Sequence, residues 1–164
     1  MRKRIKKLKT ILLTIIADLF ICINANAQGP TETVTALETY VEDVAAEFDV
    51  SEYLLASLIY EESRFLVKEN LTQITSVRWY KEGFEHCGSD DKSNPYVNIR
   101  VCGYYLNKWA QEYEGEPGLW LRFWNEGYEN ALENPGYMSG YAKRIIKRAE
   151  QWETEQKIPF PKNN

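Results

Sequence analysis

The sequence has little of the chemistry on which many enzymes depend. It contains one histidine, His86, and three cysteines. A Ser-His or Cys-His catalytic arrangement therefore has a single histidine to use, and no serine or cysteine motif accompanies it. A structural zinc site needs about four ligands, and His86 beside Cys87 lacks the others. The sequence predicts no metal site and no cofactor, and we interpret His86 as a loop residue.

Long apolar runs are also absent. The longest, Ile11–Ile23, is shorter than the roughly 20 residues that a membrane-spanning helix requires. It follows a basic segment and precedes Ala25-Asn26-Ala27, which is the order found in secretory signal peptides. We therefore expect residues 1–27 to be a signal peptide cleaved before Gln28, and the protein to be exported to the periplasm or cell envelope.

Two alternatives to a cleaved leader remain open. Residues 1–27 could be retained as a membrane anchor, although the apolar run is short. Cys22 could instead carry a lipid, but Ile21 stands where a lipobox has a small residue.

Beyond the leader, basic residues are in the minority. Residues 1–27 hold six basic residues and one acidic residue, which leaves 14 basic and 23 acidic residues in the remainder. An acidic chain is a poor partner for nucleic acid, because phosphate binding needs a basic surface. The length predicts one domain at 28–156, expected to be a monomer, with a loose tail at 157–164.

Alternation with period two is scarce, so we predict a mainly α domain with little or no β-sheet. Polar loops separate the apolar segments, and Ser51 and Asn94 are the expected N-caps of two helices. The predicted helices cover 33–48, 51–65, part of 71–84, 95 to about 113, a segment from 119 led by Pro117, and 137–152.

The two cysteines outside the leader are Cys87 and Cys102. An even number of cysteines in an exported protein usually forms disulfides, so we predict a Cys87–Cys102 bond. Two free buried thiols are the alternative.

The helix predicted at 51–65 ends with an acid on its apolar stripe. Leu55, Leu58, Ile59 and Glu62 have the spacing i, i+3, i+4, i+7, while Glu61 is predicted to face the polar side. Burial would raise the pKa of Glu62, as a general acid near neutral pH requires. The spacing is equally compatible with a structural carboxylate that pairs with Arg64.

Short motifs in a particular order distinguish these alternatives. They are Glu62-Ser63-Arg64-Phe65, Leu71-Thr72-Gln73-Ile74, Asn98-Ile99-Arg100, Gly103-Tyr104-Tyr105-Leu106, Trp124-Asn125-Glu126-Gly127, and Tyr141 with Arg144-Ile145. In this order, over about residues 51–146, the chain resembles the soluble lytic transglycosylase family of the lysozyme-like superfamily. The resemblance implies a lysozyme-like (goose-type) domain and makes Glu62 the catalytic residue.

The resemblance also implies the reaction and the substrate. Lytic transglycosylases cleave the β-1,4 bond between N-acetylmuramic acid (MurNAc) and N-acetylglucosamine (GlcNAc) in peptidoglycan strands. One glutamate acts as acid and then as base, and the product ends in 1,6-anhydroMurNAc. Ordinary glycosidases use two carboxylates. A small exported enzyme of this kind would suit local wall opening for an envelope-spanning secretion or conjugation machine.

Further site residues follow from the same motifs. Ser63, Gln73, Asn125 and Tyr141 match substrate-binding or cleft positions of the family. Ser63 could form a hydrogen bond near the helix end, and Gln73 could bind sugar hydroxyls or an N-acetyl group. Three of the residues have structural alternatives: Ser63 could be a small residue suited to packing, Asn125 could hold loop backbone, and Tyr141 could be a core residue.

The chain departs from the family at several positions. The segment between Phe65 and Leu71 is short, Asn70 replaces a glycine, and Thr72 replaces a methionine. Trp124 replaces a tyrosine, and Glu126 replaces an alanine. Glu126 could be a solvated charge, a modifier of the pKa of Glu62, or a water-activating base. A lysozyme-type hydrolase, and a degenerate module that binds glycan or a protein partner without catalysis, therefore remain alternatives.

Overall fold

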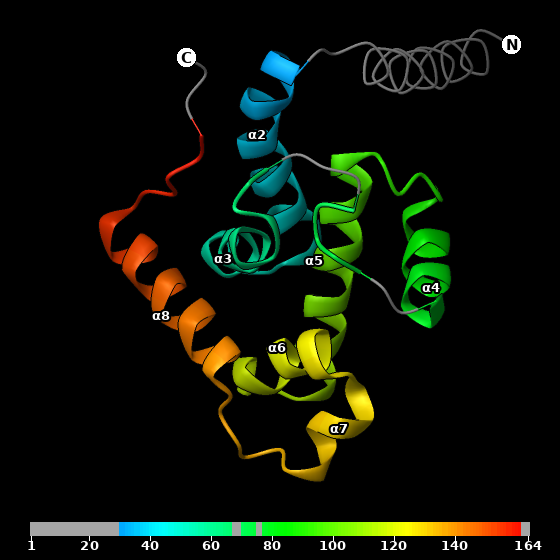
Figure 1. The fold of residues 1–164 in the computed structure, drawn as a ribbon, viewed down its shortest axis with the longest axis vertical. Helices are drawn as coiled ribbons and strands as arrows, with labels where there is room; N and C mark the ends of the chain where they lie inside the picture. Colours follow the sequence, from blue (N-terminus) through cyan, green and yellow to red (C-terminus); the bar gives the residue numbers. More distant parts are fainter. Residues whose placement is uncertain (1–29, 67–69, 75–76, 162–164) are drawn as a thin grey trace, which may run out of the picture. The chain divides into compact units, whose positions relative to one another are not determined.

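The computed structural model describes residues 30–66, 70–74 and 77–161 (Figure 1). Within these residues all regular structure is helical, so the mainly α prediction is confirmed. The chain divides into units 1–33 and 34–164, and the hydrophobic clusters and the candidate site lie in the second. The predicted signal peptide lies outside the described residues. The helices are α2 (Pro30–Phe48), α3 (Glu52–Ser63), α4 (Val77–Cys87), α5 (Pro95–Glu112), α6 (Pro117–Glu126), α7 (Tyr128–Glu133) and α8 (Gly140–Glu155).

Helix starts follow the predicted caps. Ser51 accepts a hydrogen bond from the amide of Leu54 at 3.3 Å, and the side chain of Asn94 accepts one from Tyr96 at 2.9 Å. Each side chain satisfies an amide that the first helical turn leaves without a partner. The helix predicted within 71–84 begins later, at Val77, and extends to Cys87. His86 therefore lies in the last turn of α4 and not in a loop, and its ring stacks on Tyr104 with centroids 4.2 Å apart.

Helix α5 contributes to both hydrophobic clusters of the domain. Ile99, Cys102 and Leu106 belong to the first cluster, with residues of α2, α3 and α8. Val97, Val101 and Tyr105 belong to the second, with residues of α4, α6 and α7. These two sets lie on different faces of one helix, since each recurs every three or four residues. Figure 1 shows α4 running alongside α5, and the two helices are in contact.

Close packing in the first cluster depends on one glycine. A Cβ atom added to Gly103 would lie 2.6 Å from Cγ1 of Val44 and 2.9 Å from Cδ2 of Phe48. Any larger residue at this position would therefore force α5 away from the second half of α2. The same cluster includes the interface between α3 and α8, on which the candidate site is built.

The predicted Cys87–Cys102 disulfide is wrong. Both cysteines are free thiols and both are buried. Cys102 belongs to the first cluster and Cys87, at the end of α4, belongs to the second. Each side chain therefore packs as a small hydrophobic group in its own cluster, which is a common role for free cysteine. Burial raises the pKa of the Cys87 thiol to about 11 and that of Cys102 well above its ordinary value.

The start of the predicted loose tail is packed. Ile158 and Phe160 lie against the first cluster, and the rings of Phe160 and Phe65 have centroids 5.0 Å apart. Within the segment predicted to be a loose tail, these two side chains are therefore packed. No helix within the described ranges has both the length and the apolar character needed to cross a membrane.

Candidate active site

Glu62 lies in the last turn of α3, at the interface with α8. Leu55, Leu58 and Ile59 are fully buried, so the predicted apolar stripe is confirmed. The Glu62 carboxyl is half-buried, and its Oε1 atom accepts a hydrogen bond from the hydroxyl of Tyr141 on α8. The fold thus brings together two of the residues that the motifs selected, although they are 79 positions apart in the chain.

Three influences act on the pKa of Glu62. Burial is the largest and raises the pKa, because it disfavours the charged form. The hydrogen bond from Tyr141 lowers it, and the negative charge of Glu61 raises it. The net result is a raised pKa, so Glu62 keeps its proton to higher pH than an exposed glutamate.

Tyr141 is held as a hydrogen-bond donor. Burial raises the pKa of its hydroxyl, and the charge of Glu62 and the hydrogen bond to it raise the pKa further. The hydroxyl therefore keeps its proton throughout the pH range in which Glu62 titrates. A permanent donor beside a carboxyl stabilises the ionised form whenever that form is produced.

The prediction that Glu61 faces solvent is wrong. Only 7% of its side chain is exposed, because α8 covers it. Nε of Arg144 and Nη2 of Arg148 each donate to a Glu61 carboxylate oxygen at 2.9 Å. Nη1 of Arg64, in the turn after α3, lies 3.5 Å from Oε2 of Glu61. Burial acts to raise the pKa of Glu61, but the hydrogen bonds and positive charges of Arg144 and Arg148 together outweigh it and lower the pKa.

The short segment at 70–74 is ordered by Asn70. This residue has φ of 58°, in the left-handed region that glycine adopts most readily and asparagine tolerates. Asn70 thus holds a left-handed backbone conformation at the start of this segment. Its side-chain amide donates to the carbonyl of Ile74 at 2.9 Å and accepts from the Ile74 amide at 3.0 Å.

Two departures from the family motifs contact each other. Nε1 of Trp124 donates to the backbone carbonyl of Thr72 at 3.2 Å, and Thr72 is fully buried. The hydroxyl of Thr72 in turn lies 3.4 Å from Oδ1 of buried Asn98 on α5. The segment at 70–74 is therefore tied to α6 and to α5 by the residues that replace the usual ones.

The remaining predicted site residues lie in different settings. The hydroxyl of Ser63 donates to the carbonyl of Ile59 in its own helix at 3.0 Å, which is a hydrogen bond near the helix end. Gln73 is exposed, with φ of 54°, and donates to the carbonyl of Asn70 at 3.1 Å. Asn125 is exposed near the end of α6.

Glu126 is not a solvated loop charge, which was one of its three interpretations. It lies at the end of α6, where it accepts from Nε and Nη2 of Arg122 at 2.9 Å. Only 3% of the Arg122 side chain is exposed, and its Nη1 donates to the carbonyls of Asn134 and Tyr137. Glu126 thus belongs to a structural ion pair that holds the chain after α7.

Sequence reasoning missed the arginines that surround Glu61. Arg144 and Arg148 follow Tyr141 at i+3 and i+7, so all three lie on one face of α8. That spacing is visible in the sequence and could have indicated that this face meets an acidic residue. It could not have identified Glu61 as that residue.

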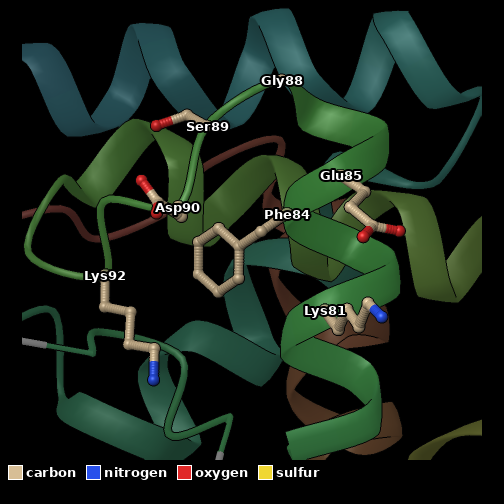
Figure 2. A pocket seen from close by; sticks show the side chains of 7 residues that line it. All are labelled: Lys81, Phe84, Glu85, Gly88, Ser89, Asp90 and Lys92. Atoms are coloured by element: carbon tan, nitrogen blue, oxygen red, sulfur yellow. The ribbon is translucent and has the colours of Figure 1, made fainter.

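A pocket of about 580 Å³ lies beside the second half of α4 and the loop that follows it (Figure 2). The ring of Phe84 faces this space, and its rim carries charges of both signs. Its lining does not include Glu62 or any residue that the motifs assigned to the site. The lining residues are Lys81, Phe84, Glu85, Gly88, Ser89, Asp90 and Lys92.

No group of His, Cys, Asp or Glu that could hold a metal ion occurs within residues 30–66, 70–74 and 77–161. No protein-family model, curated protein or solved structure matches the chain. An interpretation of the site therefore depends on the motifs and on the geometry around Glu62.

Proposed function

We propose that this protein is an exported peptidoglycan lytic transglycosylase with a lysozyme-like fold, in which Glu62 is the sole acid and base. The observation that carries the proposal is the hydrogen bond from Tyr141 to a half-buried glutamate whose pKa is raised by burial. A general acid has to hold its proton near neutral pH and release it to the substrate. The environment of Glu62 supports both requirements.

The proposed reaction has two steps. Glu62 donates its proton to the glycosidic oxygen, the bond from that oxygen to C1 of MurNAc breaks, and GlcNAc leaves with a free 4-hydroxyl. The N-acetyl group of MurNAc stabilises the positive charge at C1. Ionised Glu62 then accepts the proton of the C6 hydroxyl, whose oxygen bonds to C1. The product is a 1,6-anhydroMurNAc end, Glu62 is protonated again, and no water is consumed.

Tyr141 supports the ionised state between these steps. Its hydroxyl bonds to Oε1 of Glu62, so we assign the transferred proton to Oε2. When that proton leaves, the hydrogen bond strengthens because its acceptor becomes charged. A donor placed in advance where charge develops lowers the barrier without reorganisation.

The hydrolase alternative requires a second carboxylate to activate water. Glu126 was the candidate, and its ion pair with buried Arg122 gives it a structural role. The single-acid scheme is therefore favoured over the lysozyme-type hydrolase.

The test is the mass of the fragments released from purified peptidoglycan by the protein without residues 1–27. Anhydro muropeptides, lighter by one water than their reducing counterparts, are the expected products. Reducing ends would favour the hydrolase, and no release would favour a glycan-binding or partner-binding module. Glu62→Gln is the matched control, because it keeps the size of the side chain and removes the acid.

A further inference from the structure

A cluster of ionic side chains joins α3 to α8 beside the Tyr141–Glu62 hydrogen bond. It consists of Glu61, Arg64, Arg144 and Arg148, and we call it the Glu61 cluster. Both carboxylate oxygens of Glu61 are used, since Oε1 accepts from Arg144 and Oε2 from Arg148, each at 2.9 Å. With 7% of its side chain exposed, Glu61 is the least exposed member.

Further hydrogen bonds fix the same two helices one turn away. The hydroxyl of Ser57 on α3 donates to the carbonyl of Ile145 on α8 at 2.9 Å. Nη1 of Arg148 donates to the carbonyl of Ser57 at 3.3 Å. The guanidinium of Arg148 also lies over the ring of Tyr60, 4.7 Å from its centroid. The guanidinium of Arg64 lies 4.6 Å from the same centroid. These contacts set the position of α8 along α3.

Tyr141 lies on the same face of α8 as the arginines that bind Glu61. Arg144 is one turn after Tyr141 and Arg148 is two turns after it. On the facing helix, Glu61 and Glu62 are adjacent. A shift or rotation of α8 that breaks the pairs with Glu61 therefore also moves the Tyr141 hydroxyl away from Glu62.

We propose that Glu61 is a positioning residue, which acts through Arg144 and Arg148 to hold the Tyr141 hydroxyl against Glu62. Its importance for turnover rests on the proposed function, whereas its effect on geometry does not. Arg148 uses two guanidinium nitrogens at once, one for Glu61 and one for the carbonyl of Ser57, and such a planar group restricts orientation more than a lysine would. Such contacts suit Arg144 and Arg148, whose proposed role is to hold α8 in a fixed position along α3.

Among the residues that the structure describes, three titratable groups interact with Glu62 and bear on any test by titration. Glu61 is its neighbour on α3, Tyr141 faces it from α8, and the thiol of Cys102 faces it from α5. Glu61 has two opposing influences. Its charge raises the pKa of Glu62 directly, while the hydrogen bond that it helps to hold lowers that pKa. A single substitution would mix these influences, so the test has to separate them.

The test is a double-mutant cycle read by the pKa of Glu62 from its ¹³C carboxyl resonance. The four proteins are wild type, Glu61→Gln, Tyr141→Phe and the double variant. In the Tyr141→Phe background, Glu61→Gln removes only the direct charge effect, so the pKa of Glu62 should fall. With Tyr141 present, Glu61→Gln also weakens the hydrogen bond from Tyr141, which opposes that fall. The change in the pKa of Glu62 should therefore be more positive than in the Tyr141→Phe background. Equal changes in both backgrounds would overturn the proposal.

Arg144→Gln provides a second route if Glu61→Gln does not fold. Its side chain is 59% exposed, so its removal disturbs the core little. In the same cycle, Arg144→Gln should raise the pKa of Glu62 more when Tyr141 is present than when it is replaced.

In the peptidoglycan assay, Glu61→Gln should reduce turnover about tenfold without a matching change in KM. If the cycle shows coupling between Glu61 and Tyr141 but the wild type cleaves no glycan, only the proposed function is contradicted. If the wild type cleaves glycan but the cycle shows no coupling, only the positioning role is contradicted.

Discussion

The hydroxyl of Tyr141 donates a hydrogen bond to Oε1 of Glu62 across the interface between α8 and α3. Tyr141 keeps its proton because burial and the charge of Glu62 raise its pKa, and Glu62 keeps its own to higher pH because burial raises its pKa. The pair therefore combines an acid that keeps its proton to higher pH than an exposed glutamate with a donor that stabilises its ionised form.

Replacing Tyr141 by phenylalanine should slow glycan cleavage. The variant loses a hydrogen bond to a carboxylate, which corresponds to a loss of roughly tenfold to hundredfold in rate. Because this bond lowers the pKa of Glu62, the alkaline limb of the pH–rate profile should move to higher pH. Tyr137→Phe is the control, since Tyr137 is 53% exposed and its contact with Arg122 uses the ring. An unchanged rate and profile in Tyr141→Phe would refute the role of the hydroxyl.

Replacing Glu62 by glutamine should raise thermal stability at neutral pH. A group whose pKa is raised by folding stabilises the protein below its unfolded pKa, and that contribution is lost as pH rises through the folded pKa. Glutamine resembles the protonated acid and avoids the cost of a buried charge. The Tm of Glu62→Gln should therefore exceed that of wild type at pH 7.5, with the difference disappearing towards pH 4. Exposed Glu150→Gln is the control, and a pH-independent difference would speak against a raised pKa.

Replacing Asn70 by alanine should destabilise the protein more than replacing it by glycine. Both substitutions remove the two hydrogen bonds with Ile74, so they differ mainly in backbone conformation. Alanine at φ of 58° is strained by about 1 kcal/mol relative to glycine. Urea unfolding should therefore find Asn70→Ala less stable than Asn70→Gly by about this amount. The reverse order would show that Asn70 does not hold a left-handed conformation.

The sequence located Glu62 because its signal is local. The spacing from Leu55 to Glu62 identifies the buried stripe, and Ser51 identifies the start of the helix, without knowledge of any other element. The burial of Glu61 could not be predicted in the same way, because its partners Arg144 and Arg148 lie 83 and 87 positions away. A pattern within one helix separates its apolar and polar sides, but it does not show which polar residues a second helix will cover.

The cysteines illustrate a second limit. Their number and the expected export favoured a disulfide, but neither feature contains information about which cluster each side chain joins. Cys102 on α5 packs in the first cluster, whereas Cys87 at the end of α4 packs in the second. Covalent pairing requires a particular geometry of both residues, which a count of cysteines does not supply.

Both thiols should be detected as free. Alkylation of the unfolded protein without a reductant, followed by proteolysis and mass spectrometry, should find Cys87 and Cys102 each carrying one alkyl group. In the folded protein both should react slowly, because they are buried and their pKa values are raised. A peptide pair linked through Cys87 and Cys102 would contradict this result.

The central claim is that Glu62 alone supplies the acid and the base, so that the C6 hydroxyl of MurNAc takes the place of water. Digestion of purified peptidoglycan in H₂¹⁸O tests this claim most directly, because a hydrolase must place solvent oxygen at C1. The account predicts that wild type releases anhydro ends without ¹⁸O and that Glu62→Gln releases none. Reducing ends that carry ¹⁸O, or undiminished release by Glu62→Gln, would contradict it.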